Sequence, residues 1–109
     1  MTCLSKQQLD HYKNKGYVSP INALSSSEAK EIRDEIEKIE KDWPGSLEGI
    51  NRNYVHLISP VLNKICLNKN ILDAVESIIG RNILICGTTL FIKNPNEKGF
   101  VSYHQDAKY

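Results

Sequence analysis

The chain has 109 residues, of which 40% are hydrophobic and 25% charged, a composition typical of one small globular domain. Its 14 basic and 13 acidic side chains are spread through the sequence and give a formal charge of +1. That balance argues against nucleic acid or an anionic membrane as a partner. The N-terminus has no signal-peptide pattern, and no apolar run approaches the roughly 18 residues that span a bilayer. A cytoplasmic protein is therefore predicted.

Three cysteines, Cys3, Cys66 and Cys86, are an odd number and lack the paired spacing of a zinc site or a redox motif. We expect Cys66 and Cys86 to be small buried hydrophobic residues and Cys3 to be a free thiol.

Helix signals dominate the chain up to Gly80. A first helix is expected from an N-cap at Ser5 to a stop at Gly16. A second is expected from an N-cap at Ser25, where Glu28 completes a capping box. Its apolar positions are spaced by three and four and so share one face: Ala29, Ile32, Ile36, Ile39 and Trp43. Exposed ion pairs one turn apart are expected on the other face.

Two shorter helices follow a polar loop at 46–53. Ser59 followed by Pro60 has the pattern of an N-cap and a first helical residue. Residues 71–79 place several apolar side chains on one face, and Gly80 is expected to end that helix.

Beyond Gly80 the composition changes to branched and aromatic residues, which favour β-strands. Strands are predicted at 82–93, with a bulge or break at Gly87, and at 100–104. The intervening 94–99 is a turn by composition.

His104 and Asp106 are two good metal ligands at the end of the second predicted strand. On an extended backbone, residues two apart point to the same face about 6.6 Å apart along the strand. An imidazole and a carboxylate there can converge on one ion, while Gln105 faces away. Two histidines and one carboxylate form the facial triad that holds iron(II) in oxygenases. The sequence supplies two members of such a triad.

Three blocks, Asn70–Gly80, Phe91–Pro95 and Phe100–Asp106 with Tyr109, together resemble the phytanoyl-CoA dioxygenase family in order and spacing. The segments from Leu4 to Val18 and from Leu24 to Ile39 are similar to that family's N-terminal helical region, so the resemblance covers nearly the whole chain.

This resemblance implies an iron(II)- and 2-oxoglutarate-dependent dioxygenase with His104 and Asp106 as metal ligands. The implied fold is α+β, with N-terminal helices packed on the first strands of an incomplete double-stranded β-helix, or jelly roll. Residues 1–109 would then be one partial oxygenase domain, mainly helical at 1–80 and with the first strands of the core at 81–109.

The resemblance also implies positions near the active site for Lys93 and His56. Lys93 lies in a segment that lines the family's pocket, where it is a candidate for cofactor binding; a solvated lysine at a strand end is the alternative. His56 lies in a segment that contributes near the family's active site. The distal histidine and the arginine that binds 2-oxoglutarate are expected beyond residue 109.

The implied reaction uses molecular oxygen to hydroxylate a small organic substrate while 2-oxoglutarate is decarboxylated to succinate. Halogenation is disfavoured because it requires a small residue in place of Asp106. A jelly roll needs about eight strands and the sequence offers fewer, so we expect an N-terminal fragment that is inactive by itself. Substrate identity and oligomeric state stay open.

Two alternatives use the same residues. One is a non-catalytic helical module that binds a protein partner through an apolar face. The other is a zinc or structural metal site formed by His104, Asp106 and Cys86, although no cysteine pair supports it.

Overall fold

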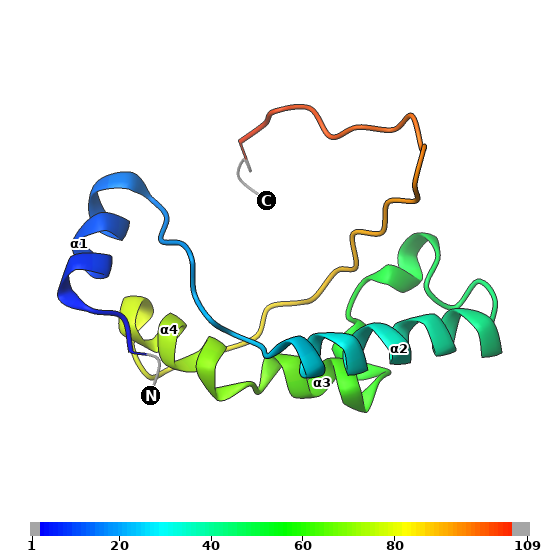
Figure 1. Ribbon diagram of the computed structural model, residues 1–109, viewed down its shortest axis with the longest axis horizontal. Helices are drawn as coiled ribbons and strands as arrows, with labels where there is room; N and C mark the ends of the chain where they lie inside the picture. Colours follow the sequence, from blue (N-terminus) through cyan, green and yellow to red (C-terminus); the bar gives the residue numbers. More distant parts are fainter. Residues whose placement is uncertain (1–2, 106–109) are drawn as a thin grey trace.

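The structure, a computed structural model, describes residues 3–105. The described chain contains four α-helices and two short 3-10 helices: α1 (Lys6–Lys15), α2 (Ser26–Asp42), η1 (Gly49–Arg52), η2 (Val55–Leu57), α3 (Pro60–Cys66) and α4 (Lys69–Ile79). In Figure 1, α2 lies alongside α3, while α1 lies near α4 at the other end of the molecule. Residues 81–105 form an open arc that leaves the helices after α4.

The predicted N-cap of α1 and the predicted capping box of α2 are confirmed, and α1 proves to have a capping box as well. At α1, the Ser5 hydroxyl accepts from the Gln8 amide, and the Gln8 side chain accepts from the Ser5 amide. At α2, the Glu28 carboxylate accepts from both the amide and the hydroxyl of Ser25. Each box satisfies amides that have no partner inside the helix, so it defines the first residue of its helix.

The predicted start of α3 and the predicted end of α4 are confirmed. The buried Ser59 hydroxyl accepts from the Leu62 amide in front of α3, with Pro60 as the first helical residue. Asn68 caps α4, which starts two residues earlier than expected, and Gly80 ends it with a positive φ of 85°. Asparagine is a strong N-cap because its carbonyl oxygen accepts from the first amides of the helix.

A small apolar core holds α2, η2 and α3 together. Its fully buried members are Leu47, Val55 and Leu62, each exposed by 4% or less. Half-buried side chains pack against them from α2, α3 and the extended segment: Ile32, Ile36, Ile39, Ile65 and Leu90. The predicted apolar face of α2 is therefore confirmed for its three isoleucines. Trp43, at its end, is 62% exposed and lies outside this core.

The N-terminal segment is anchored separately on α4. Leu4 is buried, and its amide donates to the Ser77 hydroxyl at 3.2 Å. That hydroxyl in turn donates to the Asp73 carbonyl within α4. Ala74 is the buried residue of this helix. These contacts fix where α1 begins.

The expected α+β fold is wrong for the part of the chain that the structure describes. Residues 82–93 and 100–104 form no β-strand or sheet; their β contact is an isolated antiparallel bridge between Asn53 and Thr89. A strand requires a neighbouring strand to pair its amides and carbonyls, and β-forming composition alone supplies none. Large apolar side chains stay exposed as a result, at 93% for Leu84 and 88% for Phe91.

Two smaller expectations need correction as well. Cys86, expected to be buried, is exposed because it lies on the extended segment rather than inside a sheet, and Cys66, also expected to be buried, is half-buried.

The turn at 94–99 is confirmed, with the Glu97 amide donating to the Asn94 carbonyl. No helix among residues 3–105 is long and apolar enough to cross a membrane.

Replacement of Leu62 by alanine should destabilise the protein by about 2–4 kcal/mol, because truncation of a buried leucine loses apolar burial and leaves a cavity. Leu67→Ala is the matched control, since Leu67 is 61% exposed, and it should change stability by less than about 0.5 kcal/mol. Urea unfolding followed by circular dichroism measures both. Equal losses in the two variants would contradict the proposed core.

The capping carboxylate of α2 should make the stability of this helix depend on pH. Hydrogen bonds from the side chain and backbone of Ser25 hold the pKa of Glu28 below its ordinary value of 4.5. The stabilisation is therefore present above pH 4.5 and is lost as the pH falls through the lower, folded-state pKa. Glu28→Gln should unfold with a weaker acid dependence than the native chain, whereas Glu40→Gln should keep the native dependence. Parallel pH profiles for all three proteins would contradict this assignment.

Candidate metal ligands and the extended segment

The extended segment after α4 is hydrogen-bonded to the helical part around Asn53. The Leu90 amide donates to the Arg52 carbonyl at 3.0 Å, and the Tyr54 amide donates to the Thr88 carbonyl at 2.6 Å. The Thr89 hydroxyl and the Asn53 side-chain oxygen lie 2.9 Å apart. We call residues 52–56 and 87–90 the tether. It sets the direction in which the chain leaves towards His104.

His56 is the central side chain of the tether. Its Nδ1 lies 2.7 Å from the Thr88 hydroxyl oxygen, which also accepts from the His56 amide at 3.3 Å. The Asn63 side chain, on α3, donates to the His56 carbonyl. One histidine thus connects the short helix η2, the helix α3 and the extended segment.

A close backbone approach completes the tether. A Cβ atom at Gly87 would lie 3.2 Å from the Tyr54 ring, so glycine suits this position because it has no side chain. Tyr54 itself has a positive φ of 56°, which is uncommon for a residue other than glycine. The sequence suggested a bulge or a break at Gly87; the structure uses the residue for this ring contact.

His104 is exposed near the end of the described chain. Its Nδ1 lies 2.9 Å from the Ser102 carbonyl oxygen. A carbonyl can only accept, so Nδ1 carries the ring proton and the basic lone pair of the neutral ring is on Nε2. Metal-binding histidines commonly have this arrangement, in which a backbone carbonyl orients the ring and selects the tautomer.

The other predicted site residues are not brought together with His104 by the described structure. Asp106 lies outside the described residues. Lys93 is exposed, and among residues 3–105 it makes no hydrogen bond or ion pair. His11 lies on α1, where its ring contacts Tyr17 edge-on at 5.1 Å. No group of three histidine, cysteine or acidic side chains placed to hold a metal occurs in the described part of the chain.

The contact between His56 and Thr88 was not predicted from residue patterns. These residues are 32 positions apart, and neither the spacing nor the composition of the two segments indicates that they meet. The resemblance alone directed attention to residues 53–57. No protein-family model, curated protein or solved structure matches the chain.

Removal of the Thr88 hydroxyl should loosen the tether. In Thr88→Val both contacts to His56 are lost, and we expect the Leu90 amide to exchange with solvent about tenfold faster, which corresponds to about 1.4 kcal/mol. Thr89→Val is the comparison variant: it removes one exposed contact of the tether, that to Asn53, and should therefore speed the exchange less than Thr88→Val does. Hydrogen exchange followed by NMR measures both. Unchanged exchange at Leu90 in Thr88→Val would contradict this role of the hydroxyl.

Proposed function

We propose that this chain contributes the first two iron ligands, His104 and Asp106, to an iron(II)- and 2-oxoglutarate-dependent dioxygenase of the phytanoyl-CoA dioxygenase type. The observation that carries the proposal is the His-x-Asp pair in the sequence, together with the Ser102 carbonyl, which holds the proton of His104 on Nδ1. The proposal concerns the chemistry of these residues and does not require the jelly roll expected from the sequence.

The donor set suits iron(II). A neutral imidazole and a carboxylate are two members of the facial triad found in iron oxygenases, and neither is a soft thiolate ligand that would favour zinc. Cys86, the candidate for the alternative zinc site, lies two residues before Thr88 on the tethered part of the segment.

The described residues have positioning roles in this proposal. The tether holds residues 87–90 against the helical part, so the course of the chain towards His104 starts from a fixed point. The Ser102 carbonyl orients the imidazole and keeps Nε2 as the basic atom. The missing third ligand and the group that binds the 2-oxoglutarate carboxylates would have to come from outside the residues described here.

When bound, iron(II) with 2-oxoglutarate supplies the oxidising chemistry: oxygen is consumed, 2-oxoglutarate is decarboxylated to succinate and a carbon of the substrate is hydroxylated. Asp106 fits hydroxylation better than halogenation, which needs that carboxylate to be absent. The chain by itself should bind metal weakly and should not turn over, because two ligands are fewer than the triad requires.

Manganese(II) can test the ligand pair in the chain as it stands, because it takes the same imidazole and carboxylate donors and its unpaired electrons broaden nearby NMR signals. Low concentrations of manganese(II) should broaden the resonances of Ser102 to Gln105. This broadening should disappear in His104→Ala and in Asp106→Ala. His11→Ala is the matched control and should broaden like the native chain.

Iron and co-substrate are then added anaerobically to a polypeptide extended by the coding sequence downstream of residue 109. A weak visible charge-transfer band that requires iron(II), 2-oxoglutarate, His104 and Asp106 is the expected result. Manganese broadening that is uniform over the chain, or a folded extended protein without the band, would contradict the proposal.

A further inference from the structure

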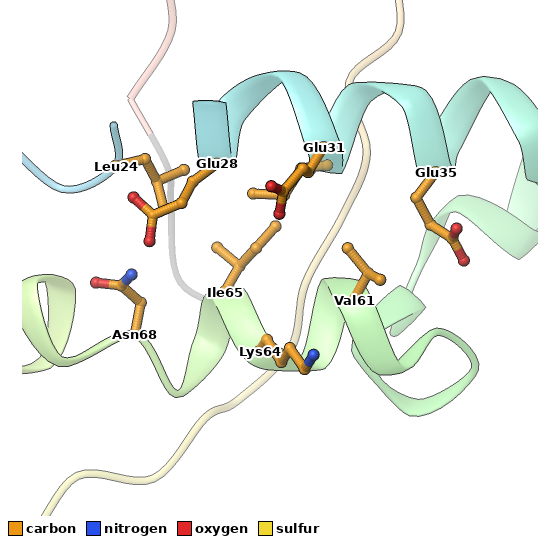
Figure 2. A pocket seen from close by; sticks show the side chains of 9 residues that line it. Leu24, Glu28, Glu31, Glu35, Val61, Lys64, Ile65 and Asn68 are labelled. Carbon is orange, nitrogen blue, oxygen red and sulfur yellow. The ribbon is translucent and has the colours of Figure 1, made fainter. Parts of the chain in front are cut away.

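A groove between α2 and α3 lies outside the candidate metal ligands. Its volume is about 390 Å³, within the range of ligand-binding clefts. Apolar side chains from both helices and from the residue before the α2 cap line it: Leu24, Ile32, Val61 and Ile65. In Figure 2, Val61 and Ile65 point from α3 towards α2, and the carboxylates of Glu31 and Glu35 lie along the α2 side.

The charged residues of α2 fall into a paired and an unpaired group. Lys30 pairs with Asp34, and Arg33 with Glu37, all on exposed parts of the helix. Glu31 and Glu35, like Glu40 and Asp42 nearer the end of the helix, make no hydrogen bond or ion pair with any residue from 3 to 105. Of these four acidic residues, Glu31 and Glu35 line the groove, and Glu35 is half-buried.

The charge of the groove is predominantly negative. Three carboxylates, those of Glu28, Glu31 and Glu35, line it together with one ammonium group, that of Lys64. Glu28 is occupied by the cap at Ser25, and Figure 2 shows Lys64 on the α3 side. The groove therefore combines an apolar floor with two carboxylates that lack a cation.

We propose that this groove binds a basic amphipathic helix of another protein. Glu31 and Glu35 are one helical turn apart, so their carboxylates match two lysines or arginines that are also one turn apart. From Glu28 to Glu35 the groove follows two turns of α2, or about 11 Å, and Leu24 before the cap lengthens it, which suits a helix of about three turns. The apolar face of such a helix covers Ile32, Val61 and Ile65, as in other helix-in-groove complexes.

Charge complementarity favours this partner over an uncharged or acidic one. A cation beside Glu31 and Glu35 gives these carboxylates the partner that residues 3–105 do not supply, and an acidic helix would add repulsion from all three glutamates. The inference uses residues of α2 and α3 alone. It does not depend on metal binding at His104.

Fluorescence anisotropy of a labelled leucine–lysine amphipathic peptide of about four turns tests the proposal with the 109-residue chain. We expect micromolar binding that weakens with added salt. Glu31→Gln with Glu35→Gln should weaken it about fivefold to tenfold, as expected for the loss of two partly screened ion pairs. The matched control is Glu40→Gln with Asp42→Asn, which removes the same charge from exposed positions of α2 outside the groove and should leave binding within about twofold.

A peptide with glutamate in place of lysine should not bind, and Val61→Ala should weaken the lysine peptide because the apolar floor is reduced. Circular dichroism must show native helix content in each variant. Equal weakening by the two double variants would overturn the proposal, because bulk charge would then explain the binding. Sedimentation that shows a dimer dissociated by Glu31→Gln with Glu35→Gln would also overturn it, since a second copy of the chain would be the occupant.

Discussion

Burial of Leu47, Val55 and Leu62 beneath the isoleucines of α2 is the interaction on which the arrangement of the molecule depends. The three residues come from the loop after α2, from η2 and from α3, so their contact joins three different segments of the chain. Leu90 adds the extended segment to the same cluster. Because the core is small, each member contributes a large share of the burial that opposes chain entropy.

The two functional proposals arise from different parts of this arrangement. The core places η2 beside α3, and His56 then holds Thr88, so the extended segment leaves the helical part at a defined point. The same core sets the separation of α2 and α3, and the groove lined by Glu31 and Glu35 lies between these two helices. Metal ligation and partner binding would therefore use separate surfaces with a shared support.

Local interactions explain why the helix predictions were correct and the strand predictions were wrong. Ser5, Ser25, Ser59 and Asn68 each cap amides within three residues along the chain, so the information lies in short sequence patterns. A strand depends on a partner distant in sequence. Residues 82–93 have the composition of a strand, yet in the described structure they meet one short stretch around Asn53 and form an isolated bridge.

The sequence by itself determined the N-caps of α1, α2 and α3, the glycines that end α1 and α4, the isoleucine face of α2 and the identity of the His-x-Asp pair, because these follow from local hydrogen bonding, periodicity and donor chemistry. Tertiary structure alone decided that His56 meets Thr88, that Gly87 lies against the Tyr54 ring and that two glutamates of α2 border an apolar groove. Those contacts join residues far apart in the chain. Their formation depends on how the small core orients whole helices and segments, and short sequence patterns do not specify that orientation.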